Sequence, residues 1–139
     1  MKPFQFLEHT ADKGAIAYGT TLEELFANGA LSMVSLMCRP DAAPVTEERR
    51  IELSAPDLET LFVRWLSELV YLLDTEGLLG TRFQVESVRD DAMAAIVGFA
   101  RVDRESFAQE GALVKAITYH GLEIVQKSGV WSVTYYVDV

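Results

Sequence analysis

Residues 114–139 read VKAITYHGLEIVQKSGVWSVTYYVDV and decide the fold class. Two runs within this stretch, 114–125 and 130–139, are rich in β-branched and aromatic residues, which is typical of strands. Lys127-Ser128-Gly129 lies between them as a short polar turn. Because so short a turn joins neighbouring antiparallel strands, the sequence predicts a β-hairpin here and an antiparallel sheet around it.

Two amphipathic helices are predicted before this hairpin. The first shows the capping-box spacing of Thr21 and Glu24 and ends near Cys38, because a proline follows two residues later. The second begins at about Asp57, a suitable N-cap, and Gly77 is its expected end. Each helix should bury one face, since apolar residues recur at three- and four-residue steps. These apolar positions are Leu22, Leu25, Phe26, Gly29, Met33, Leu36 and Met37, then Leu58, Leu61, Phe62, Trp65, Leu69, Leu72 and Leu73.

The other predicted strands are short segments between and beside the helices. They cover residues 4–8, 14–19, 46–54, 83–88 and 93–102. A loop is expected at 41–45 and an irregular charged segment at 103–111. The order β-β-α-β-α-β-β-β-β predicts an α+β two-layer sandwich, with two helices packed on one mostly antiparallel sheet. We expect a single domain over residues 1–139, and the strand order does not follow from the sequence.

The composition excludes several classes of protein. The net charge is −9, which argues against a surface that grips nucleic-acid phosphates or anionic lipid. Arg49, Arg50, Arg101 and Arg104 could form a small basic patch, but neighbouring acids favour a solvated surface instead. The lone Cys38 and the absence of a signal-peptide pattern or an uninterrupted apolar stretch predict a cytoplasmic protein. The sequence also lacks GxGxxG, P-loop and GxSxG motifs, which disfavours those nucleotide and hydrolase folds.

Two polar segments contain residues that the predicted strands and turns do not require. The first is Glu8-His9-Thr10-Ala11-Asp12, whose spacing alone favours an Asx-turn at Asp12 and a surface His9. The second is Lys115-Ala116-Ile117-Thr118-Tyr119-His120, where a lysine begins an apolar and aromatic strand. Such a lysine either protects an exposed sheet edge or acts as a paired functional amine, and edge protection is the more common role.

The last two residues form a third candidate site. The carboxylate of Asp138 lies beside the α-carboxylate of Val139, and the two repel unless a cation or basic group lies between them. Hard cations such as Ca²⁺ and Mg²⁺ prefer such oxygen ligands. The alternative is a frayed, solvated tail, but the alternating strand pattern continues to the end of the sequence.

At these three places the sequence resembles the archease family, and the resemblance covers essentially the whole chain. It is densest at residues 8–12, continues through 17–19 and 21–26, and recurs at 114–120 and in the final Asp-aliphatic pair. The resemblance implies a small cytosolic accessory protein rather than an enzyme. Members of this family assist the RtcB-type RNA ligase in tRNA splicing and RNA repair, promoting GTP-dependent guanylylation of the ligase and multiple turnover.

Carried over from the family, the ligase-activating residues are Asp12, Lys115 and Asp138. The implied metal ligands are Asp12, Asp138 and the terminal carboxylate of Val139, with His9 as an accessory residue. The metal would be a divalent ion of the Ca²⁺ or Mg²⁺/Mn²⁺ type, and GTP would belong to the partner ligase. No direct contact with RNA or membrane is expected.

This sequence departs from the family pattern at two places. Lys13 follows Asp12 where relatives usually have an aliphatic residue, and the Gly-Glu pair and histidine common before the lysine motif are missing. Two other functions remain open: a stand-alone metal-dependent phosphohydrolase built on the same acids, or a general acidic chaperone and interaction module. Against the phosphohydrolase, the sequence offers no dense ligand cluster and no general base beyond His9.

Overall fold

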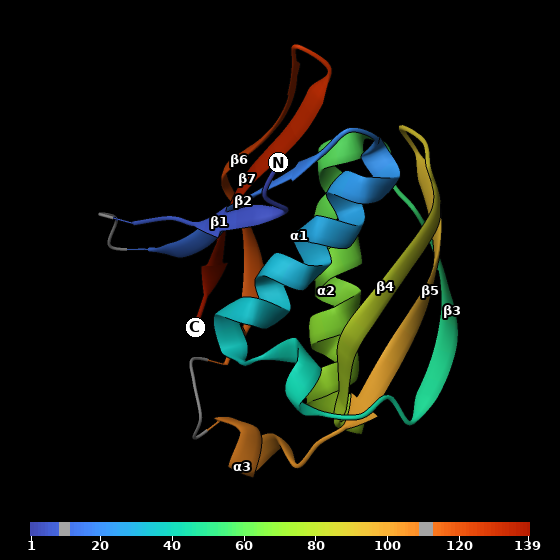
Figure 1. The fold of residues 1–139 in the computed structure, drawn as a ribbon, viewed down its shortest axis with the longest axis vertical. Coiled ribbons are helices and arrows are strands. Elements are labelled where there is room, and N and C mark those ends of the chain that lie inside the picture. Colours follow the sequence, from blue (N-terminus) through green and yellow to red (C-terminus); the bar gives the residue numbers. More distant parts are fainter. Residues whose placement is uncertain (9–11, 109–112) are drawn as a thin grey trace.

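The computed structural model describes residues 1–8, 12–108 and 113–139. Helices α1 (Leu22–Met37) and α2 (Leu58–Glu76) lie between two antiparallel sheets (Figure 1). One sheet has four strands in the order β1-β2-β7-β6, and the other has three in the order β3-β5-β4. The α+β class and the packing of two helices on antiparallel strands are therefore confirmed. The expected single sheet is corrected to two, with the helices between them.

The strand bounds follow the predicted segments with a few shifts. The strands are β1 (Phe4–Phe6), β2 (Lys13–Gly19), β3 (Glu47–Ser54), β4 (Leu78–Val88), β5 (Ala92–Arg101), β6 (Ala116–Lys127) and β7 (Val130–Asp138). The main difference is β4, which begins directly after α2 rather than at residue 83. Its first residues, Leu78 to Gly80, are fully buried against β5, so they lack the alternation that marks a half-buried strand.

Two short helical turns lie where irregular chain was expected. A 3-10 turn, η1 (Pro40–Ala42), begins the predicted loop, and the short helix α3 (Arg104–Ala108) lies in the charged segment after β5. None of the helices in the described parts of the chain is long and apolar enough to cross a bilayer.

Local hydrogen bonds explain where the two long helices begin and end. Thr21 Oγ1 accepts from the Glu24 amide at 3.1 Å, and Asp57 Oδ1 accepts from the Thr60 amide at 2.7 Å. The hydrogen bonds from Thr60 hold the pKa of Asp57 below its usual value. Gly77 ends α2 at φ 67°, a left-handed conformation that favours glycine. The predicted caps are confirmed.

The core joins both helices to the four-stranded sheet. Phe26 of α1 packs edge-on against Phe62 of α2, and Phe62 packs on Tyr135 of β7. Gly29 permits this close approach, because a Cβ there would lie 2.5 Å from the Phe62 ring. The Tyr135 hydroxyl lies 2.6 Å from Ser32 Oγ, both fully buried, and burial raises the pKa of Tyr135.

The predicted hairpin is formed by β6 and β7. Ser128 and Gly129 turn between them with φ of 53° and 77°, as the tight twist of such hairpins requires. Strand β6 also carries a wide bulge: Thr118 pairs with Tyr136 and Glu123 with Thr134, so residues 119–122 oppose Tyr135 alone. The bulge leaves β6 as an irregular edge of the four-stranded sheet.

Candidate functional site at one end of the four-stranded sheet

Three of the predicted site residues meet at one end of the four-stranded sheet. Asp12 directly precedes β2, Asp138 ends β7, and Lys115 directly precedes β6. The β2–β7 register pairs Lys13 with Val137, so one residue further Asp12 comes opposite Asp138. Residues 126 positions apart in the sequence are thus brought together by strand pairing.

A hydrogen bond ties Lys115 to the same place. Its backbone amide donates to the Asp138 carbonyl at 2.8 Å, and the next residue, Ala116, pairs with Asp138 in the β6–β7 register. Adjacent strands lie about 4.8 Å apart. The backbones of Asp12, Asp138 and Lys115 therefore lie side by side on the lines of β2, β7 and β6.

The charges at this end face solvent. Asp12, Lys115 and Asp138 are exposed, and Val139 is about half exposed at 49%. The Asp138 carboxylate makes no hydrogen bond or ion pair with the described residues. Two carboxylates opposite each other repel, and a cation between them removes that repulsion. The predicted accessory residue, His9, lies outside the described residues.

Two hollows flank this end of the sheet. Asp12 lines one of about 380 Å³ between the β1–β2 edge and α1, together with Phe6, Leu7 and Leu36. Lys115 lines another of about 250 Å³ between β6 and α2, together with Tyr71 and Asp74. Asp12 and Lys115 therefore face different hollows, and the site is an exposed sheet end between them rather than one enclosed pocket.

The donor set fits a hard divalent cation better than a soft one. Asp12, Asp138 and the terminal carboxylate of Val139 supply only oxygen atoms, which suit Ca²⁺, Mg²⁺ or Mn²⁺. Among residues 1–8, 12–108 and 113–139, no group of three or more His, Cys, Asp or Glu side chains is placed to hold a metal. Two side-chain carboxylates leave coordination positions open for water or for groups of a partner.

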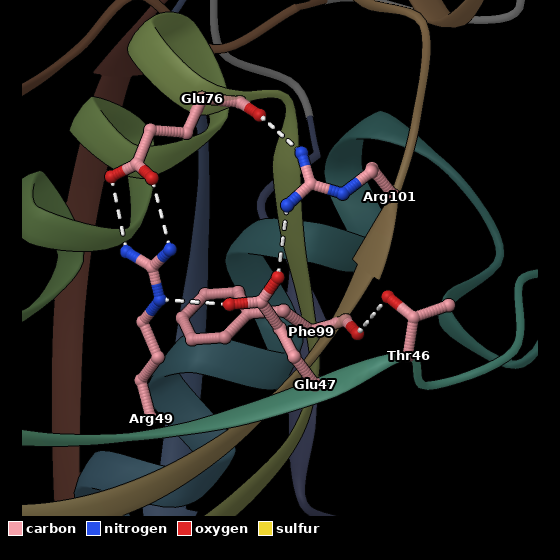
Figure 2. Close-up of polar contacts among 6 residues, drawn as sticks. All are labelled: Thr46, Glu47, Arg49, Glu76, Phe99 and Arg101. Carbon is pink, nitrogen blue, oxygen red and sulfur yellow. Dashed lines mark hydrogen bonds and ion pairs between the residues drawn. The ribbon is translucent and has the colours of Figure 1, made fainter.

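The arginines considered as a basic patch are instead paired with acids. Figure 2 shows Arg49 donating to both oxygens of Glu76 at 2.9 and 3.0 Å and to Glu47 at 2.9 Å. Arg101 donates to the other oxygen of Glu47 at 3.0 Å and to the Glu76 carbonyl. These bonds hold the pKa of Glu76 below its usual value and raise the pKa of Arg49.

The other two arginines are paired as well. Arg50 binds Glu52 and Glu86, and Arg104 binds Asp74 at 2.8 Å. Because each guanidinium is matched by a carboxylate, this region offers little free positive charge to a phosphate backbone. The predicted solvated surface is confirmed.

Sequence reasoning assigned no role to three exposed aromatic residues. Phe6 and Tyr71 line the two hollows, and Tyr119 lies in the bulge of β6. A usable signal existed for Tyr71, which falls outside the apolar stripe of its helix. The bulge that presents Tyr119 left no local signal beyond Gly121.

The fold and the site together define a class of small α+β protein in which distant acids and a lysine meet at one sheet end. The Archease protein family (MTH1598/TM1083) matches residues 4–139. The archease of Methanosarcina mazei is 37% identical over 142 residues, covering 99% of this chain and 97% of that protein. The archease of Methanothermobacter thermautotrophicus is 38% identical over 130 residues, 93% of each chain. The chain belongs to the archease family.

Solved structures agree with this fold. The solution structure of Methanobacterium thermoautotrophicum protein 1598 superposes with a TM-score of 0.77, at 32% identity over 100% of both chains. The crystal structure of a Thermotoga maritima protein, called an archease and possible chaperone, gives a TM-score of 0.68 over 100% of this chain and 97% of that one. At 21% identity the second similarity supports the fold alone.

Proposed function

We propose that the chain is an accessory protein that activates an RtcB-type RNA ligase, promoting GTP-dependent guanylylation of the ligase and its multiple turnover. Its role lies in tRNA splicing and RNA repair in the cytoplasm, and the RNA is bound by the ligase. Membership in the archease family makes this the leading function. The single observation that carries it is the meeting of Asp12, Asp138 and Lys115 at one exposed sheet end.

The two acids form the proposed metal site. Asp12 and Asp138, with the terminal carboxylate of Val139, would hold a divalent ion of the Ca²⁺ or Mg²⁺/Mn²⁺ type, and His9 is an accessory residue. Such an ion supplies concentrated positive charge beside a triphosphate. The exposure of the Asp138 carboxylate supports this assignment, because nothing in the described chain neutralises it.

Lys115 supplies the second positive charge of the site. Its ammonium is a compact, strongly hydrated charge, suited to a phosphate oxygen. The backbone bond to Asp138 fixes where Lys115 leaves the sheet, so the lysine backbone lies beside that of Asp138. Nucleotidyl transfer depends mainly on positioning and charge stabilisation, which a second protein can provide from outside the ligase.

Two other functions give different outcomes. A stand-alone phosphohydrolase would turn over phosphate esters without any ligase. A general chaperone or interaction module would retain its affinity for the ligase after chelation and after Asp12→Ala. Asp12 and Asp138 are exposed at a sheet end and share no enclosed pocket with Lys115, which disfavours the phosphohydrolase.

The test is the rate of ligase guanylylation with Asp12→Ala, Lys115→Ala and Asp138→Ala. Each is expected to lower the stimulation roughly tenfold or more, because each removes a charge placed at the reacting nucleotide. Glu48→Gln and Lys127→Ala serve as matched controls: Glu48 is on the other sheet, and Lys127 is at the far end of β6. Folded variants that all stimulate like wild type would show that the site is wrongly assigned.

A further inference from the structure

Three of the aromatic side chains in the described chain are exposed, two in the hollows of the proposed site and one in the bulge of β6. Phe6, Tyr71 and Tyr119 are 45%, 58% and 59% exposed. The other described aromatic side chains are buried or half-buried. Single exposed apolar residues are normal on a protein surface, but a group at one site marks an interaction surface.

Two of the exposed rings share a hollow with one of the charged residues, and the third lies further along the same edge strand as Lys115. Phe6 lines the hollow that Asp12 also lines, and Tyr71 lines the hollow of Lys115. Tyr119 follows Lys115 by four residues along the β6 edge. Phe6 therefore lies on the β1 side of the four-stranded sheet, Tyr71 lies on α2, and Tyr119 lies on the β6 side. The acids at the ends of β2 and β7 lie between these sides.

The bulge in β6 is a built feature that presents Tyr119. Gly121 adopts φ 70°, and a Cβ there would lie 2.6 Å from the Tyr136 ring, so only glycine fits. The His120 amide donates to Thr118 Oγ1 at 3.0 Å, which closes the local turn. Bulges often redirect side chains next to functional sites.

The outer region of the three-stranded sheet lacks such rings. Its long exposed side chains are arginines and glutamates paired with one another, such as Arg50 with Glu52 and Arg82 with Glu48. Paired charges are satisfied within the chain, whereas an exposed tyrosine ring has apolar area that a partner can cover.

We propose that Phe6, Tyr71 and Tyr119 are the anchors by which the chain docks on the protein rim of the partner ligase's active site. This inference rests on the proposed function and adds the surface that holds the charged sheet end in place. Aromatic residues, above all tyrosine and tryptophan, dominate binding energy at the centre of protein interfaces. Two hollows beside the rings provide room for side chains of the partner.

Charge favours a protein occupant over RNA. The net charge is −9, and Asp12 and Asp138 stand among the rings, so an RNA backbone would be repelled. An enzyme cleft that handles a triphosphate is lined by cationic groups, which complement the two acids. The surface therefore fits a protein with a cationic cleft.

The test measures the Kd of the purified RtcB-type ligase for single alanine variants and for the pair Tyr71→Ala/Tyr119→Ala. Each single variant is expected to weaken binding roughly tenfold, while saturating amounts still stimulate guanylylation. Val125→Ala is the matched control, because Val125 is an exposed apolar residue of β6 beyond the bulge. Circular dichroism checks folding, and the tyrosine pair keeps the test valid if Phe6→Ala unfolds.

The outcomes separate this inference from the function on which it rests. Stimulation by wild type together with unchanged Kd values for the tyrosine variants would overturn the docking surface alone. Weakened binding of these variants, with normal stimulation by Asp12→Ala and Asp138→Ala, would leave the docking surface standing and overturn the charged site. Wild type that neither binds nor stimulates would overturn both. Binding to a single-stranded RNA oligonucleotide that is lost with the rings, while ligase affinity stays unchanged, would assign the surface to RNA.

Discussion

The two sheets of this protein carry their charges in opposite ways. On the three-stranded sheet and at the end of α2, arginines and glutamates neutralise one another, as in the network of Glu47, Arg49, Glu76 and Arg101. At the end of the four-stranded sheet, Asp12 and Asp138 come opposite each other instead. The difference teaches that some acids of the chain are used to stabilise the fold, while those of the proposed site are placed at an exposed sheet end. Acids matched to arginines hold elements together, whereas the proposed site needs a cation or a partner beside its acids.

The four-stranded sheet is joined to the helices by a buried hydroxyl pair, and breaking it should give the largest effect on stability. Ser32→Ala leaves the buried Tyr135 hydroxyl without its partner, so we expect a loss of about 1–3 kcal/mol in the free energy of unfolding. Urea denaturation measures it.

Tyr135→Phe is the matched control. It should cost less, because Ser32 Oγ still donates to the Gly29 carbonyl at 2.7 Å. Equal losses in the two variants would contradict a particular cost of leaving the buried tyrosine hydroxyl without a partner.

The charge network of the three-stranded sheet should contribute less. Arg49→Leu removes three hydrogen bonds to two glutamates, and we expect the thermal midpoint to fall by a few degrees. Arg82→Leu breaks a single ion pair with Glu48 that is more exposed to solvent. This variant should leave the thermal midpoint unchanged. If both variants melt alike, the network has no more effect than an isolated pair.

The smallest expected effect is in the pH dependence of stability. Arg49 holds the pKa of Glu76 below its ordinary value of 4.5, so the ionised carboxylate stabilises the folded state fully above that value. This contribution is lost as the pH falls through the lowered pKa.

Urea midpoints measured between about pH 6 and pH 3 check the sign. Glu76→Gln should flatten the acid loss of stability relative to wild type. A steeper loss in this variant would contradict the assignment.

The features of the fold that depend only on neighbouring residues could be predicted from the sequence. The caps Thr21, Asp57 and Gly77 act through bonds within one helical turn, and the Ser128-Gly129 turn is equally local. The division into two sheets depends on pairing between distant strands, which periodicity does not encode. The start of β4 at Leu78 does not follow from the sequence, because a strand and a helix core look alike in a short apolar run.

The candidate site was only partly predictable for the same reason. The motifs marked Asp12, Lys115 and Asp138 separately, and their roles came from the family resemblance. Their meeting depends on the β2–β7 and β6–β7 registers, which only the folded chain defines. The exposed position of Tyr119 depends on a bulge whose residues look like an ordinary strand.

The most direct test of the central claim is a double-mutant cycle on Asp12 and Asp138, read as the rate of ligase guanylylation. If the two acids form one site, Asp12→Asn and Asp138→Asn should each remove most of the stimulation, and the double variant should be no worse than either. If every variant is folded and the double variant loses stimulation by the product of the two single losses, the acids act independently. That result would contradict the account.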